Sequence, residues 1–231
     1  MYFSSPSGQF AKIGLIHGLL LGTLVLACII ASIHPLDFKS YLLHQVGTVL
    51  GVALLLFLQS KRQVSLMGFA LTIAFILLHI LGAHYLYSYV PYNDWIKSWV
   101  GVDLNQYFGW SRNMYDRLIH FSYGLLLFKI CCDVFSAWLP QVKPFQIVVL
   151  AIQFIMASSM VYELIEWWIA VGMSPEAAEN YNGQQGDIWD AQKDMALATL
   201  GALCAALIQR FYLCLNRKKQ SHAKFTGTGR H

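Results

Sequence analysis

Six long apolar stretches occupy most of this chain, and they decide which class of fold it can adopt. A helix needs about 20 apolar residues to cross the hydrocarbon core of a bilayer. Stretches that reach or nearly reach this length lie at residues 13–33, 41–59, 64–87, 114–137, 145–170 and 190–214. Only 12% of the 231 residues are charged, whereas a soluble domain has about 25%. The sequence therefore predicts an all-α integral membrane protein, a bundle of about six transmembrane helices.

Basic residues gather on one side of these stretches. Lys12 precedes the first stretch, Lys61 and Arg62 follow the second, Lys143 lies between the fourth and the fifth, and several more follow the sixth. Because Lys and Arg are concentrated in cytoplasmic loops, both termini are predicted to be cytoplasmic. We expect residues 1–216 to form a single transmembrane domain and the basic residues 217–231 to form a disordered cytoplasmic tail.

The net charge and the cysteine content restrict the classes of partner that we expect for this chain. The net charge of +4 comes mostly from short loops and the C-terminal segment, so it reflects membrane topology and predicts no nucleic-acid partner. The five cysteines lie inside or at the end of apolar stretches without a Cys-x-x-Cys pair, which favours packing over disulfides. The partner is the lipid bilayer, and the oligomeric state stays unknown.

An aromatic-rich segment separates the third and fourth stretches. Residues 88–113 contain seven aromatic side chains, and amphipathic rings of this kind settle in the headgroup layer of a membrane. A short interfacial helix is expected around Asp94–Val102. The segment is either a simple interfacial anchor or a lid that guides a lipid or another amphiphilic small molecule to a site.

Six acids and one histidine lie in or beside the last three apolar stretches. An ionisable group at bilayer depth is costly, so it usually has a partner or a function. The residues are Asp116, His120, Glu163, Glu166, Asp187, Asp190 and Asp194. Their spacings of three, four and seven keep each set on one helix face. With the spans threaded, all seven lie within one or two turns of the outer surface, near His79.

Carboxylates and imidazoles together are ligands for divalent metals. The residues predicted to bind a metal ion, of unknown identity, are His120, Glu163, Glu166, Asp187, Asp194 and His79. Asp116 and Asp190 would complete the ligand shell or act as general base, and Arg117 would hold an anionic group. The alternative is structural, because Arg117 and Lys193 can neutralise acids and acids at helix N-termini suit the helix dipole.

Four motifs carry a resemblance to a known family. They are His79-x-x-Gly82-x-His84-Tyr85, Tyr115-Asp116-Arg117-x-x-His120-Phe121-x-x-Gly124, Tyr162-Glu163-x-x-Glu166-Trp167 and Gln185-Gly186-Asp187-x-Trp189-Asp190 with Asp194 after it. Together they resemble the YjdF-type family of predicted inner-membrane proteins, a domain of unknown function, and more distantly the VanZ-like proteins. The resemblance implies a multi-pass protein of the bacterial inner membrane and assigns no reaction.

Three functions fit these observations. The first is a metal-dependent enzyme that acts on a lipid or a lipid-linked envelope substrate through the acidic, histidine-containing pocket. The second is a proton- or cation-coupled transporter that uses the same polar groups. The third is a non-catalytic membrane protein that binds a ligand headgroup or confers envelope resistance.

Overall fold

The computed structural model describes the backbone of residues 14–227, and the side chains of this range except residues 176–177, 179–180 and 217–227. Every regular element in the described range is a helix, so the predicted all-α fold is confirmed. The helices are α1 (Leu15–Ala31), α2 (Phe38–Ser60), α3 (Leu66–His84), α4 (Tyr92–Val100), α5 (Leu104–Phe108), α6 (Tyr115–Trp138), α7 (Pro144–Val171), α8 (Pro175–Asn182) and α9 (Asp190–Gly227).

The six predicted apolar stretches correspond to α1, α2, α3, α6, α7 and α9. Five of these helices are long and apolar enough to cross a membrane, α9 with its segment Asp190–Asn216. The sixth, α1, has 17 residues, which gives about 26 Å at 1.5 Å per residue. The structure is therefore that of a multi-pass helical membrane protein with five candidate spans and one shorter apolar helix.

Helix α9 extends further than the sequence predicted. The helix continues to Gly227, whereas residues 217–231 were expected to be disordered. Lys, Arg, Gln and Ala make up six of the eleven residues 217–227; they are good helix formers, and extending an existing helix costs less than starting a new one. Residues 228–231 lie outside the described range.

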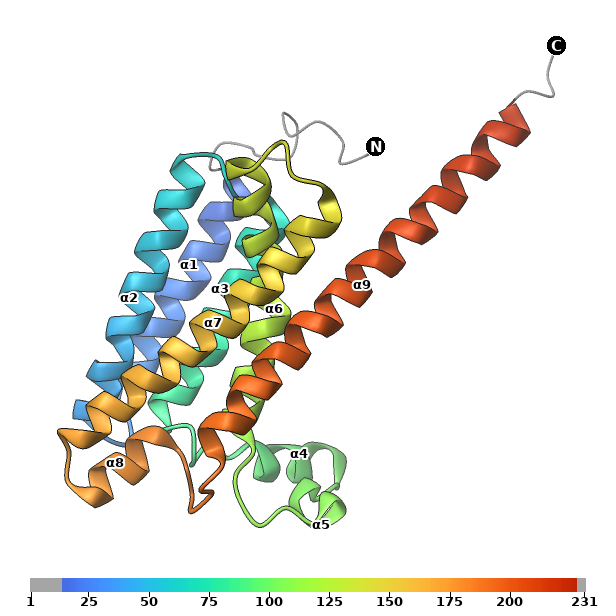
Figure 1. Ribbon diagram of the computed structural model, residues 1–231. Helices are drawn as coiled ribbons and strands as arrows, with labels where there is room; N and C mark the ends of the chain where they lie inside the picture. The colour runs from blue at the N-terminus through green and yellow to red at the C-terminus, as the bar shows by residue number, and fades with distance from the viewer. Residues whose placement is uncertain (1–13, 228–231) are drawn as a thin grey trace.

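The two ends of the bundle differ in composition. Figure 1 shows the α2–α3 and α6–α7 loops at one end and α4, α5 and α8 at the other. The first two loops hold Lys61, Arg62 and Lys143, so we call this the inner end, in line with the predicted orientation. Lys12 lies outside the described range. At the outer end, α4 lies where a short helix was expected around Asp94–Val102, and Trp99 on it is 81% exposed.

Close contact between α6 and α9 fixes the outer end of the bundle. A Cβ atom added to Gly124 would lie 1.8 Å from the carbonyl oxygen of Ala198, and one added to Gly201 would lie 2.1 Å from that of Phe121. Because both glycines lack a side chain, the two backbones touch there. This contact places the first turns of α9 against those of α6, which hold most of the predicted site residues.

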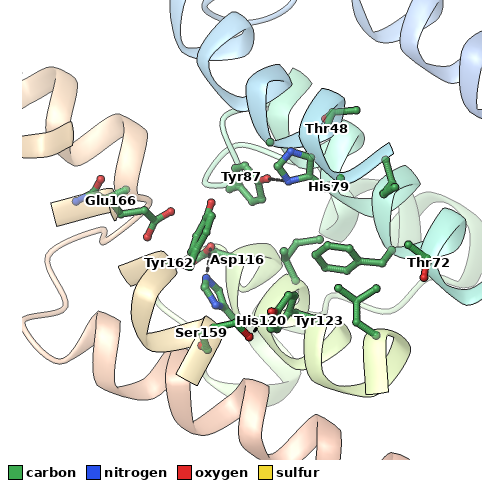
Figure 2. A pocket seen from close by; sticks show the side chains of 18 of the residues that line it. Thr48, Thr72, His79, Tyr87, Asp116, His120, Tyr123, Ser159, Tyr162 and Glu166 are labelled. Atoms are coloured by element: carbon green, nitrogen blue, oxygen red, sulfur yellow. Dashed lines mark hydrogen bonds and ion pairs between the residues drawn. The ribbon is translucent and has the colours of Figure 1, made fainter. Parts of the chain in front are cut away.

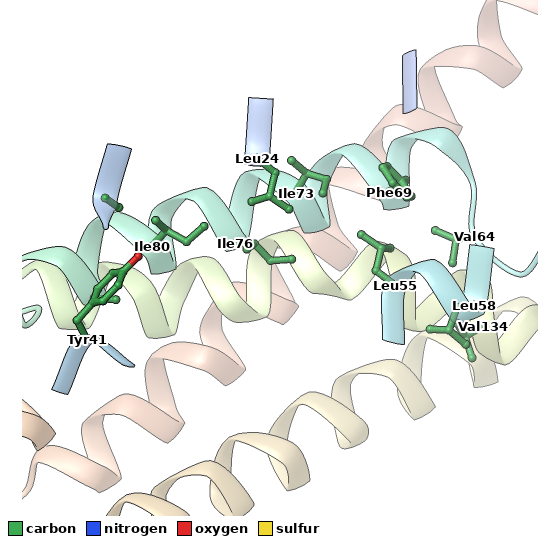
Figure 3. Packing of buried hydrophobic residues seen from close by; sticks show 12 residues of the cluster. Leu24, Tyr41, Leu55, Leu58, Val64, Phe69, Ile73, Ile76, Ile80 and Val134 are labelled. Atoms are coloured by element: carbon green, nitrogen blue, oxygen red, sulfur yellow. The ribbon is translucent and has the colours of Figure 1, made fainter. Parts of the chain in front are cut away.

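A separate apolar core joins α1, α2, α3 and α6. Figure 3 shows Leu24 of α1 beside Ile73 of α3, and Leu58 of α2 beside Val134 of α6, all within one buried cluster. This core holds α1 and α2 on α3. It leaves α2 without extensive packing on α7 among the described residues, since α2 makes its main contacts with α3.

Candidate functional site

Three predicted site residues converge at the outer end, and we call them the carboxylate–histidine cluster. Asp116 and His120 lie one turn apart on α6 and Asp194 lies on α9, and one potential ligand atom from each falls within 4.8 Å of the others. All three residues are buried. The α6–α9 contact brings them together, because it sets Asp194 opposite the first two turns of α6.

The spacing within this cluster suits a metal ion. His120 Nε2 lies 3.6 Å from Asp116 Oδ1, and two ligands at about 2.1 Å from a tetrahedral metal are about 3.4 Å apart. One buried oxygen of the cluster, Asp116 Oδ2, has no hydrogen-bond partner. A buried carboxylate oxygen without a donor is costly, so the donor set fits a bound cation.

Glu163 of α7 approaches the other side of the same imidazole. Its Oε1 lies 3.6 Å from His120 Nδ1, while His120 Nε2 faces Asp116. Metal-binding histidines commonly give their second N–H to a carboxylate, which fixes the ring orientation. Glu163, predicted as a direct ligand, lies beside His120 at a distance longer than a hydrogen bond, and its Oε1 has no hydrogen-bond partner.

Two arginines neutralise the acids at the start of α9. Arg117 Nη2 lies 2.5 Å from Asp190 Oδ1 and 3.1 Å from Asp187 Oδ2, and its Nη1 lies 2.5 Å from Asp194 Oδ1. The last pair is close but lacks hydrogen-bond geometry. Arg112 adds a bond of 2.7 Å to Asp190 Oδ1. Arg117, predicted to hold an anionic group, thus holds aspartates of this chain.

Asp187 lies in the turn before α9, since this helix begins at Asp190. Its Oδ2 accepts a hydrogen bond of 2.6 Å from Lys193, and its Oδ1 accepts one of 3.0 Å from the Trp189 backbone N–H. Lys193 first, then the Trp189 amide, lower the pKa of Asp187 below its ordinary value of 3.8. This carboxylate is satisfied by partners in the chain itself, and it stands apart from the carboxylate–histidine cluster.

The charges of this region do not balance. Its six carboxyl groups, named in the sequence analysis, face the three permanent cations Arg112, Arg117 and Lys193. Excess negative charge in a water-poor region is removed by protons or by a bound cation. Buried oxygens of Asp116 and Glu163 have no hydrogen-bond partner, whereas Asp194 Oδ1 lies 2.5 Å from Arg117 Nη1.

A cavity of about 280 Å³ adjoins the cluster, and we call it the apolar cavity. It lies between α2, α3, α6 and α7, with α8 at its outer end, and most of its wall is apolar. Figure 2 shows Asp116, His120 and Glu166 on the same side of it, with Tyr162 between Glu166 and the two α6 residues. The acids thus border a space at bilayer depth that is large enough for part of an amphiphile.

His79 lines the same cavity on α3 but does not join the cluster. Its Nε2 donates to the His44 carbonyl oxygen at 3.2 Å, so its Nδ1 accepts the 2.5 Å bond from the Tyr87 hydroxyl (Figure 2). Burial raises the pKa of Tyr87 well above 10.0, which keeps this hydroxyl protonated. Both ring nitrogens of His79, a predicted metal ligand, are already in use.

A second cavity of about 290 Å³ lies on the opposite side of Glu166, between α7, α9 and the segment that joins α8 to α9. A larger share of its wall is polar than in the apolar cavity, so we call it the polar cavity. Glu166 and Asn182 line both spaces. Glu166, predicted as a metal ligand, therefore stands at the partition between an apolar and a polar compartment.

The sequence analysis assigned no site role to several residues that build the site. Arg112 lies outside every apolar stretch, so its sequence position gave no sign that it would contact Asp190. Gln185 exchanges two hydrogen bonds with the backbone of Asn113, at 2.8 and 3.0 Å. These bonds join the segment between α8 and α9 to the segment between α5 and α6. Tyr181 of α8 stacks on His44. Gln185 had a signal in its motif, and α8 had one in the serine followed by a proline at Ser174-Pro175.

Comparisons with known proteins agree with this architecture. No solved structure matches the chain. The inner membrane protein YjdF of Escherichia coli (strain K12) is 30% identical to it over 192 residues, which cover 83% of this chain and 88% of that protein. This similarity and the apolar helices support a multi-pass protein of the inner membrane. A family model described as "Predicted membrane protein (DUF2238)" matches residues 16–214. The chain therefore belongs to the DUF2238 family of predicted membrane proteins.

Proposed function

We propose that this protein is a divalent-metal-dependent enzyme that acts on a lipid or lipid-linked substrate of the cell envelope. One observation carries the proposal. The potential ligand atoms of Asp116, His120 and Asp194 lie within 4.8 Å of one another beside a largely apolar cavity at bilayer depth. A site of this kind places reactive groups next to a space that a membrane lipid can reach.

The ligand types of the carboxylate–histidine cluster favour some metal ions over others. Two carboxylates and one imidazole suit zinc, manganese or ferrous iron better than calcium, which prefers oxygen ligands alone. When bound, such an ion would polarise a phosphoryl or carbonyl oxygen or lower the pKa of a water molecule. Its charge would also offset the excess of carboxylates around His120.

The other side chains have separate roles in this proposal. Glu163 orients His120 through its Nδ1 side. Glu166 borders both cavities, so it is the candidate general base for water that comes from the polar cavity. Arg112 and Arg117, with Asp187 and Asp190, fix the start of α9 and hence the position of Asp194.

Metal content tests the proposal directly. The protein is purified in mild detergent without chelator, and bound metals are measured by elemental mass spectrometry before and after incubation with zinc, manganese or ferrous iron. We expect near-stoichiometric metal in the wild type and almost none in an Asp116→Asn/Asp194→Asn double variant. Asp103→Asn is the control, because Asp103 pairs with Lys97 in the outer loop and should retain full metal content.

The Glu163→Gln variant tests whether Glu163 is a direct metal ligand or only orients His120. If Glu163 only orients His120, its loss should weaken metal affinity about 10–100-fold without abolishing binding. Complete loss of metal in this variant would make Glu163 a direct ligand. Absence of metal from the wild type under every condition would reject the enzyme and favour proton-coupled transport or ligand binding.

A further inference from the structure

We infer that the apolar cavity binds one glycerophospholipid of the bilayer, which enters sideways between α2 and α7. The inference names a substrate class for the proposed enzyme and rests on that function only for the claim that the lipid is transformed. Three features of the cavity support it: an open wall, a closed outer end and two hydroxyl groups without partners.

The open wall lies between two spans. Gly47, Thr48 and Gly51 of α2 line one side, and Ser158 and Ser159 of α7 line another. These two helices have no extensive packing on each other among the described residues. A Cβ atom added to Gly51 would meet nothing within 4 Å, so the backbone of α2 borders free space. Since both helices are candidate spans, that side of the cavity faces lipid.

Aromatic rings close the outer end. Tyr181 of α8 stacks on His44 of α2, with ring centroids 4.6 Å apart and planes 10° from parallel. The Tyr87 ring lies 5.0 Å from the same imidazole. These contacts cover the cavity toward the outer surface and join α8 to α2. A ligand therefore reaches the cavity more easily from the bilayer than from the aqueous side.

Two buried hydroxyls inside the cavity lack partners. Thr48 and Ser159 are 6% and 2% exposed, and neither Oγ atom has a hydrogen bond. Hydroxyls within helices often bond to the carbonyl four residues earlier, as Thr72 does to Gly68 at 2.8 Å. Because a buried unpaired hydroxyl is costly, these two groups indicate a ligand with acceptors at their depth.

A glycerophospholipid meets these conditions. Ser159 lies seven residues before Glu166 on α7, about 10 Å deeper in the membrane at 1.5 Å per residue. The headgroup would lie at the level of Glu166 and the carboxylate–histidine cluster, where a bound cation or the ammonium group of phosphatidylethanolamine would offset the repulsion between its phosphate and the excess carboxylates. The ester carbonyls would accept from Thr48 and Ser159, and an acyl chain would occupy the apolar remainder beside Phe75 and Leu127.

Filling the cavity tests the inference. Wild-type protein, Gly51→Leu and Gly22→Leu are reconstituted in vesicles of phosphatidylethanolamine and phosphatidylglycerol, extracted in mild detergent and examined by native mass spectrometry. Gly22 is the matched control, since an added Cβ there also meets nothing within 4 Å and α1 does not line the cavity. We expect one retained phospholipid in the wild type and Gly22→Leu, and at least a tenfold lower occupancy in Gly51→Leu. Equal occupancy in the two leucine variants, or no lipid in the wild type, would overturn the inference.

The hydroxyls provide a second measurement that avoids steric change. Thr48→Val and Ser159→Ala should each lower lipid affinity about fivefold, the effect of one hydrogen bond. Thr23→Val on the exposed face of α1 is the control, because its hydroxyl already bonds to Leu19. Unchanged affinity in both cavity variants would refute the assigned contacts. Metal is measured on the same samples, so lipid retained by a metal-free protein would reject the enzyme and leave the lipid site standing.

Discussion

The buried acid at the inner end of this bundle and the acids at the outer end differ in how many hydrogen-bond donors surround their carboxylates. Asp133 on α6 is surrounded by donors, since it accepts bonds from the Ser65 backbone N–H at 3.0 Å and the Ser65 hydroxyl at 2.6 Å and pairs with Lys129. Ser65 in turn caps α3 by accepting a bond from Gly68. At the outer end, Asp116 and Glu163 each keep a buried oxygen without a hydrogen bond, whereas Asp194 Oδ1 lies 2.5 Å from Arg117 Nη1.

The comparison shows that burial alone does not mark a functional acid. Asp133 is as buried as Asp116, yet its carboxylate is held by Ser65 at the start of α3 and by Lys129 on its own helix. What distinguishes the outer acids is the combination of mutual proximity, unpartnered oxygens and an adjoining cavity. Asp187 and Asp190 lie between the two cases, because basic side chains satisfy them.

The largest expected effect on stability comes from the inner acid. Asp133→Ala should lower the free energy of unfolding by about 3–5 kcal/mol, because it leaves Lys129 and the Ser65 donors without their partner. Unfolding in sodium dodecyl sulfate measures the change, and Asp133→Ala/Lys129→Ala should recover part of it. The folded fraction of the single variant should keep its metal content. A loss below about 1 kcal/mol would remove the contrast with the outer end.

A smaller effect of opposite sign is expected at the outer end. In metal-free protein, Asp116→Asn should leave the free energy of unfolding unchanged or raise it by about 1 kcal/mol, since an amide removes one of several crowded negative charges. With metal present the wild type should be the more stable protein, because binding stabilises the folded state. The same unfolding titration, with and without chelator, measures both. A destabilisation equal to that of Asp133→Ala in metal-free protein would show that Asp116 is a structural acid.

The smallest effect is a pH dependence at Asp187. The folded-state pKa of this carboxyl is lowered, so its ionised form stabilises the folded state above about pH 4, the ordinary value for aspartate. That contribution is lost as the pH falls through the lowered pKa. The stability difference between wild type and Asp187→Asn should therefore be constant near neutral pH and vanish in acid. A difference that persists unchanged below pH 3 or so would contradict the ion pair with Lys193.

The hydrophobicity of the sequence was sufficient to predict the candidate spans and the position of the acids near one end of the bundle. A helix at bilayer depth must satisfy its own backbone, so a long apolar stretch permits few alternatives. The spacing of Asp116 and His120 then fixed a shared face on α6. The prediction of a helix in the aromatic segment was also met, by α4.

The sequence alone did not show which acids pair with basic side chains and which form the carboxylate–histidine cluster. Partner choice depends on which loop residues reach the helix ends, and neither Arg112 nor Gln185 lies in a periodic pattern. His79 was included among the predicted metal ligands because it was expected at the same depth in the membrane as the acids. In the structure, the turn after α3 places the Tyr87 hydroxyl against its Nδ1. In that turn Leu86 and Tyr87 both have a φ of 53°, a backbone conformation that residue type does not predict for leucine or tyrosine.

The glycine contact between α6 and α9 also has a meaning for biosynthesis. Asp194 belongs to the last span in chain order, while Asp116 and His120 leave the ribosome many residues earlier. Until α9 inserts and closes against Gly124, the earlier helices hold only part of the carboxylate–histidine cluster. The cluster can therefore form only after the first turns of α9 have been synthesised, and a ribosome-bound chain halted before residue 190 would be present in the membrane without it.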